Sequence, residues 1–167
     1  MSAPPGIRET FAAFESPYNL ARITPPWLNF RVTTPGRIAM RAGAEIDYAI
    51  RRLGLPIKWT TRIVEYEPPR RFVDEQIRGP YRLWRHRHTF RESAAGTVIS
   101  DCVDYRLPFG ILGAAAHALL IRRQLIAIFR FRQQAIARLL LPENPGAAVI
   151  GEPMVRRVSS KTTVFPA

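Results

Sequence analysis

Hydrophobic and polar residues alternate with a period of two through the middle of the chain, from Trp27 to Leu107. This period is typical of strands with one buried face. The breaks are short and rich in proline and glycine, which favours antiparallel pairing of consecutive strands. Six strands are predicted, over residues 29–34, 45–53, 57–66, 71–78, 82–92 and 97–107.

Helical periodicity flanks this region on both sides. Two short helices are predicted over residues 7–14 and 17–23, and a long one over 112–140, which Pro142 ends. The apolar stripe of the long helix needs a large partner surface, and the predicted sheet supplies one. We therefore predict an α+β domain over residues 1–141, followed by a flexible tail rich in proline, glycine and serine over 142–167.

The loop over residues 93–96 sets the register of the last two strands. Pairing inward from this loop places His88 opposite Asp101 and His86 opposite Val103 on one face. The same face then holds Trp84, Phe90, Ile99 and Tyr105. We expect this face to point toward the long helix.

The two preceding strands extend this face. A tight Gly79-Pro80 turn brings Asp74 and Gln76 beside the histidines, and alternation places Trp59 inward on its own strand. His117, near the start of the long helix, could reach the mouth of the cavity or lie exposed. The predicted ligand-binding residues are Trp59, Asp74, Gln76, Trp84, His86, His88, Phe90, Asp101, Tyr105 and His117.

The predicted His88–Asp101 pair is the candidate for chemistry. A carboxylate beside an imidazole fixes its tautomer and raises its basicity, so the pair could orient a ligand or serve catalysis. The same groups could instead satisfy one another as a structural network. Two histidines with Asp74 or Asp101 could bind a metal, but without a cysteine or a third histidine nearby we predict no metal site and no cofactor.

Composition adds a strong positive charge. The formal net charge is +12, and of 25 basic residues only Lys58 and Lys161 are lysines. The arginines are scattered, so binding of nucleic acid or an anionic membrane is the last of the alternatives. One cysteine, Cys102, and no apolar leader or membrane-length segment predict a protein of the reducing cytoplasm.

Several segments of the sequence resemble the ligand-binding SRPBCC family of the START-like superfamily, whose bacterial members include polyketide cyclase/dehydrase-like proteins. They include residues 18–27 and 66–76, the 79–81 turn, and the 107–110 segment. The resemblance covers about residues 7–140. It implies a helix-grip fold, in which a curved antiparallel sheet wraps around a long C-terminal helix with a hydrophobic cavity between them.

The resemblance also implies candidate functions. The first is binding of a small hydrophobic or lipid-like molecule, in a closed pocket on the order of several hundred Å³. The second is a cyclase, dehydratase or hydrolase that uses His88 and Asp101. Some relatives suggest a functional link to an epimerase-like oxidoreductase.

The sequence departs from the family pattern at its start. The family begins with a strand before the first helix, and residues 1–6 are too short and too rich in proline to supply it. A missing strand leaves one sheet edge unpaired. Residues 155–165 have some strand character and could take its place.

Overall fold

The computed structural model describes residues 5–52, 54–94, 96–108, 111–141 and 154–158, without the side chains of residues 52 and 111–120. Two short helices, α1 (Ile7–Glu15) and α2 (Pro17–Arg22), open the chain, and a single 3-10 turn, η1 (Pro26–Leu28), follows them. The long helix α3 spans Ile111–Leu140. These helices match the predicted ones within two residues at each end.

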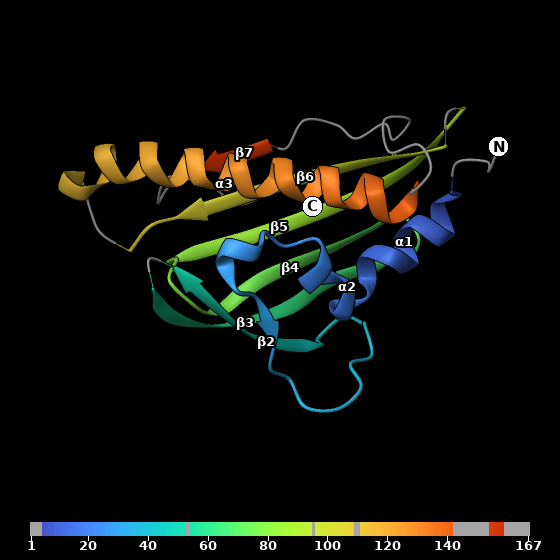
Figure 1. Ribbon diagram of the computed structural model, residues 1–167, viewed down its shortest axis with the longest axis horizontal. Helices are drawn as coiled ribbons and strands as arrows, with labels where there is room; N and C mark the ends of the chain where they lie inside the picture. The colour runs from blue at the N-terminus through green and yellow to red at the C-terminus, as the bar shows by residue number, and fades with distance from the viewer. Residues whose placement is uncertain (1–4, 53, 95, 109–110, 142–153, 159–167) are drawn as a thin grey trace.

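The sheet has seven strands in the order in which they occur along the chain (Figure 1). All neighbours pair antiparallel except the last two. The predicted α+β helix-grip fold is therefore confirmed. The strands are β1 (Arg31–Val32), β2 (Glu45–Arg52), β3 (Leu55–Glu67), β4 (Arg71–Arg78), β5 (Leu83–Ser93), β6 (Gly96–Arg106) and β7 (Met154–Arg157).

The first strand is shorter than the sequence pattern predicts. Asn29 takes a left-handed conformation with φ of 43° directly after η1, so the chain is still turning there. Asparagine tolerates this conformation better than most residues. Only Arg31 and Val32 then pair with β2, opposite Ala49 and Tyr48.

The β5–β6 hairpin has the register that the sequence predicts. Its ladder begins at Ser93 opposite Gly96 and runs to Leu83 opposite Arg106. His88 therefore lies opposite Asp101, and Trp84 opposite Tyr105. On the other side of β5, Asp74 of β4 lies opposite His86.

Two apolar clusters fix the helices on one face of the sheet. Phe11 of α1 and Ile136 near the end of α3 pack with Phe72, Phe90 and Ile99 of the sheet. Farther along, α3 packs against β6 in a cluster of Val103, Tyr105, Ile121, Leu125 and Phe129. The histidine-bearing face is therefore the inner one, as predicted.

Register shifts in β3, at Thr60/Thr61 and at Ile63/Glu65, introduce bulges, which bend and twist a strand.

The C-terminal segment differs from the expected tail. Four of its residues form β7, which runs parallel to β6 at the edge of the sheet opposite β1. Arg156 of β7 donates two hydrogen bonds to Asp104, at 2.7 and 2.9 Å. Residues 155–157 of β7 belong to the segment 155–165, for which the sequence indicates some strand character.

Candidate functional site

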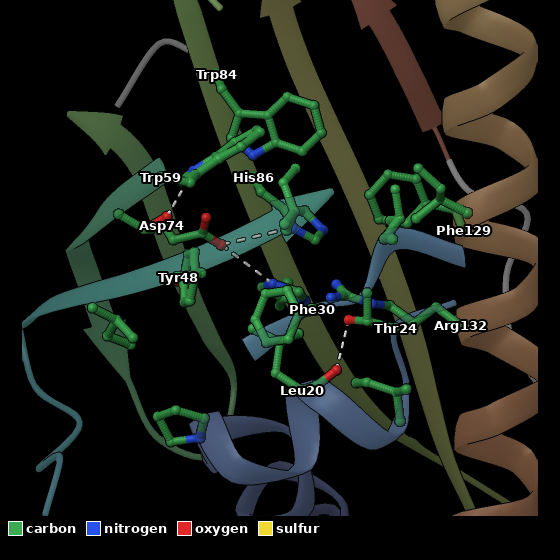
Figure 2. A pocket seen from close by; sticks show the side chains of 18 of the residues that line it. Leu20, Thr24, Phe30, Tyr48, Trp59, Asp74, Trp84, His86, Phe129 and Arg132 are labelled. Atoms are coloured by element: carbon green, nitrogen blue, oxygen red, sulfur yellow. Dashed lines mark hydrogen bonds and ion pairs between the residues drawn. The ribbon is translucent and has the colours of Figure 1, made fainter. Parts of the chain in front are cut away.

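A cavity of about 190 Å³ lies between the inner face of the sheet, the α2 region and α3 (Figure 2). Apolar side chains form most of its wall. The sheet contributes Ile46, Ile63 and Phe72, and α3 contributes Leu125, Ile128 and Phe129. The volume is smaller than the several hundred Å³ expected.

Three aromatic side chains stand together at one end of the cavity. Trp59 of β3 packs edge-on against Trp84 of β5, with ring centroids 5.2 Å apart, and Tyr81 contacts both. The indole N–H of Trp59 donates to the hydroxyl of Thr61 at 3.1 Å. The predicted positions of Trp59 and Trp84 on the cavity wall agree with the structure.

A polar cluster interrupts the apolar wall on β4, β5 and β6. Asp101 Oδ1 lies 3.2 Å from His86 Nε2 and 2.7 Å from His88 Nδ1. On the other side of the rings, Asp74 Oδ2 lies 3.6 Å from His86 Nδ1 and 3.5 Å from His88 Nε2. Each histidine and Asp101 is 4% exposed. The predicted His88–Asp101 contact is therefore present, and Asp101 contacts His86 as well.

Burial and neighbouring charges shift the pKa values of this cluster in different directions. Burial lowers the pKa of His86, and the adjacent His88 lowers it further. Burial also opposes the charged form of His88, but Asp101 and Asp74 outweigh it and raise its pKa. For Asp101, burial alone would raise the pKa, yet the two histidines hold it well below its usual value. Of the two imidazoles, His88 is the more basic.

Some predicted site residues lie behind the cavity wall instead of on it. Phe90 belongs to the apolar cluster with Phe11, Tyr105 belongs to the cluster with Val103, and Asp101 supports the histidines from beneath. The side chain of His117 lies outside the described residues. Of the ten candidates, Trp59, Asp74, Trp84, His86 and His88 line the cavity.

Gln76 serves the β4–β5 turn. Its side-chain amide donates to the carbonyl oxygen of Tyr81 at 2.6 Å and accepts from the backbone N–H of Tyr81 at 3.3 Å. A Cβ atom at Gly79 would lie 2.3 Å from Gln76 Oε1, so the glycine leaves room for this contact. The predicted strand face is right, but Gln76 lies near the end of β4, and its amide binds the backbone of Tyr81 instead of lining the cavity.

Tyr48 and Arg132 are among the polar residues of the cavity wall that the predicted set lacks. Tyr48 of β2 lies on the inner face with Ile46, and burial, with a further effect of Asp74, raises its pKa. Arg132 of α3 extends toward the centre of the cavity (Figure 2). Alternation along β2 could have found Tyr48, and an arginine within the apolar stripe of the helix could have indicated Arg132.

The sequence has no comparable pattern that would identify the cavity residues on the α1–α2 side of the wall. Phe14, Leu20 and Thr24 line the cavity from this side. The Thr24 hydroxyl donates to the carbonyl oxygen of Leu20 at 2.6 Å. These short helices have too few turns for their own pattern to show which face meets the sheet.

Comparison with models of known protein families shows to which family the chain is related. A profile described as "Polyketide cyclase / dehydrase and lipid transport" matches residues 2–129 of the 167-residue chain. The chain belongs to this family. The resemblance noted in the sequence is thus confirmed, and membership indicates a small ligand of unspecified identity. No curated protein matches the chain.

Solved structures similar to this family member support the same fold. A protein from Chromobacterium violaceum matches with a TM-score of 0.61 at 14% identity, over 86% of this chain and 94% of its own. One from Nitrosomonas europaea gives 0.60 at 11%, over 86% and 92%. One from Mycobacterium smegmatis gives 0.60 at 17%, over 85% and 88%. At these identities the likeness concerns the fold alone.

Many arginines on the outer face of the sheet are paired with carboxylates. Arg62 contacts Glu45 at 2.6 Å, and Arg85 bridges Glu65 and Glu75 at 2.5 and 2.7 Å. These pairs reduce the positive potential available to an anionic partner. Within the described part of the chain, no helix is long and apolar enough to cross a membrane.

Proposed function

We propose that this protein binds a compact, largely apolar small molecule in the cavity between the sheet, the α2 region and α3. The observation that carries the proposal is the cavity itself, with its mostly apolar wall and the polar groups set within it. Concave apolar sites with a small number of polar groups are typical of ligand pockets. Family membership supports the same class of function.

The cavity volume limits the size of the ligand. This volume is about 190 Å³. Drug-sized ligands occupy cavities of about 300–1,000 Å³. We therefore expect a molecule of one or two rings, or a short branched chain, in place of a full-length lipid.

Arg132 suggests that this molecule carries a hydrogen-bond acceptor or an anionic group. Its Nε lies buried without a hydrogen-bond partner among the described residues. A buried guanidinium N–H gains most from an acceptor, and a carboxylate is the acceptor that matches its geometry. Tyr48 offers a hydroxyl on the β2 side of the same cavity.

The direct test is recovery of the bound molecule. Protein purified without denaturation would be extracted with organic solvent and the extract analysed by mass spectrometry. We expect one compound in near-stoichiometric amount, which denatured and refolded protein lacks.

A second test fills the cavity. Ile50 of β2 lines the cavity, whereas Ile77 of β4 is 46% exposed and does not. Fluorescence titration with 2-naphthol should show much weaker binding to Ile50→Trp than to the wild type, and unchanged binding to Ile77→Trp. Equal binding by both variants would place the dye elsewhere and reject the cavity as the binding site.

A third test concerns the charge of the ligand. Replacing Arg132 by methionine keeps the length of the side chain and removes its charge. We expect Arg132→Met to weaken binding of 2-naphthoate and to leave binding of 2-naphthol nearly unchanged. Equal effects on both compounds would assign Arg132 a packing role.

Proton transfer by His88 is a second candidate function. It is favoured by the contact of Asp101 with His88 Nδ1, which leaves the Nε2 side of the ring toward the cavity and Asp74. The compound extracted from the wild type would be incubated with wild-type protein and with His88→Gln, and its conversion followed by chromatography. No conversion by the wild type would reject catalysis. The cytoplasmic location and the link to an epimerase-like oxidoreductase stay predictions.

A further inference from the structure

The two histidines of the cavity wall are held from behind by one carboxylate. Asp101 Oδ1 contacts His86 Nε2 at 3.2 Å and His88 Nδ1 at 2.7 Å, and Asp101 is 4% exposed. The His86 contact has hydrogen-bond geometry, whereas the shorter His88 contact is a close electrostatic one; in both places the carboxylate favours an N–H on the facing nitrogen. In the neutral tautomers, His86 Nδ1 and His88 Nε2 then present bare lone pairs on the other side.

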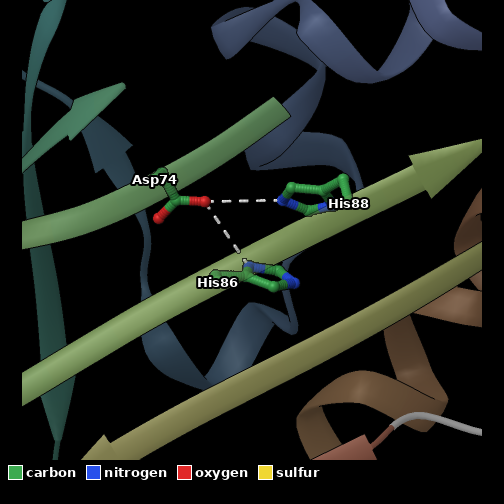
Figure 3. A group of neighbouring side chains, drawn as sticks. All are labelled: Asp74, His86 and His88. Carbon is green, nitrogen blue, oxygen red and sulfur yellow. Dashed lines mark ion pairs between the residues drawn. The ribbon is translucent and has the colours of Figure 1, made fainter. Parts of the chain in front are cut away.

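Those lone pairs face a second carboxylate across a gap. Asp74 Oδ2 lies 3.6 Å from His86 Nδ1 and 3.5 Å from His88 Nε2, as Figure 3 shows. At these distances direct hydrogen bonds are absent or very weak. Asp74, His86 and His88 each offer one ligand atom within 4.8 Å of the others.

The spacing matches the ligands of a common metal ion. Bond lengths of about 2.1 Å in a tetrahedral site put neighbouring ligand atoms about 3.4 Å apart. The two measured distances from Asp74 Oδ2 lie within about 0.2 Å of that value. Two imidazoles and one carboxylate with open positions are a known set of ligands for transition metals, and a carboxylate behind each histidine is the usual support for such ligands.

We propose that Asp74, His86 and His88 bind a divalent transition-metal ion, such as Zn²⁺ or Fe²⁺, through Oδ2, Nδ1 and Nε2. Asp101 positions both imidazoles, and the remaining coordination positions face the cavity, which all three ligands line. The inference stands apart from the proposed binding of an apolar molecule. It excludes His88 as a general base, because both nitrogens of a metal-bound His88 are engaged.

Formal charge supports this assignment. The carboxylates of Asp74 and Asp101 bring two negative charges into a site where the histidines are 4% exposed. A divalent ion balances them with both imidazoles neutral, which is the form that binds metals. The guanidinium of Arg132 on the same cavity wall adds one positive charge, which the anionic group proposed for the ligand would balance. The sequence predicts no metal for the same histidines with Asp74 or Asp101, for want of a cysteine or a third histidine, but it cannot show that the ligand atoms of Asp74, His86 and His88 lie within 4.8 Å of one another.

The test uses full-length protein without a histidine tag, freed of metal by chelation. Calorimetric titration with Zn²⁺, and visible absorption on addition of Co²⁺, should both show one ion per chain. Asp74→Asn should weaken binding at least ~100-fold, and Asp101→Asn, which leaves the ligands in place, ~10–100-fold. Glu75→Gln, the next residue on β4 and part of the outer ion pair with Arg85, should bind like the wild type.

A measurement on the wild-type protein tests the proposal even if the variants do not fold. Zn²⁺ should shift the side-chain ¹⁵N resonances of two of the three histidines, at Nδ1 of one ring and Nε2 of the other. Absence of stoichiometric binding, or shifts of other nitrogens, would overturn the proposal. So would equal binding by Asp74→Asn and Glu75→Gln, which would indicate an adventitious surface site. Because the titration uses metal alone, its failure leaves the naphthol result untouched.

Discussion

The inner and outer faces of the sheet use similar residue types in opposite environments. On β4 and β5, Asp74, His86 and His88 point inward, whereas the neighbouring Glu75 and Arg85 pair outside. Each inner histidine is 4% exposed, while the outer side chains of Arg62 and Glu45 are 48% and 47% exposed. Arg85, at 18%, is less exposed than Arg62, so water screens the Arg62–Glu45 pair most, and the inner groups depend on one another. A shift of one residue along a strand changes what a charge contributes to stability.

The largest expected effect comes from removing the support of the inner cluster. Asp101→Ala leaves two buried imidazoles without their shared carboxylate, and breaking a buried pair in this way costs about 3–5 kcal/mol. Urea unfolding followed by fluorescence would measure the loss. Ser100→Ala, the preceding residue on β6, is the control and should change stability by less than about 0.5 kcal/mol. A loss below about 1 kcal/mol for Asp101→Ala would mean that the cluster does not act as a unit.

An intermediate effect is expected where an exposed arginine meets a buried carboxylate. Asp104 is 1% exposed, and Arg156 of β7 donates two hydrogen bonds to it. Arg156→Ala should reduce the free energy of unfolding by about 1–3 kcal/mol, because the buried carboxylate loses these two donors. Arg157→Ala, the exposed neighbour on the same strand, should have little effect. Equal losses for the two variants would argue that β7 contributes through its backbone alone.

The smallest effect is expected on the outer face. Glu45→Ala removes the partner of Arg62, an exposed pair that contributes about 0.2–1 kcal/mol. The difference from the wild type should shrink in concentrated salt, because ions screen exposed charges. A double-mutant cycle with Arg62→Ala in urea would measure the coupling. A coupling that is large and independent of salt would remove the distinction between the two faces.

The sequence predicts the β5–β6 hairpin well for a physical reason. The Ser93–Gly96 turn fixes the register, and every later pair then follows from the strict period of two. His86, His88 and Asp101 therefore lie on the predicted inner face. The strand pattern does not predict the proposed metal ligation by Asp74, because that ligation depends on the side-chain rotamers of residues on two strands.

Other parts of the site depend on contacts between distant segments. The α1–α2 side of the wall, with Phe14 and Leu20, is placed by packing of Phe11 against the sheet. Gln76 exchanges two hydrogen bonds with the backbone of Tyr81, five residues along the chain and beyond the end of β4. Neither of these contacts leaves a periodic pattern in the sequence.

By itself the sequence determined the class of fold, the limits of most strands, the long helix, and which residues of the hairpin face inward. These follow from local rules, since side chains alternate along a strand and recur every 3.6 residues along a helix. The tertiary structure decided the cavity volume, the sharing of Asp101 by two histidines, the position of Arg132 and the pairing of β7. Each of these depends on the distance between residues far apart in the chain, which packing sets.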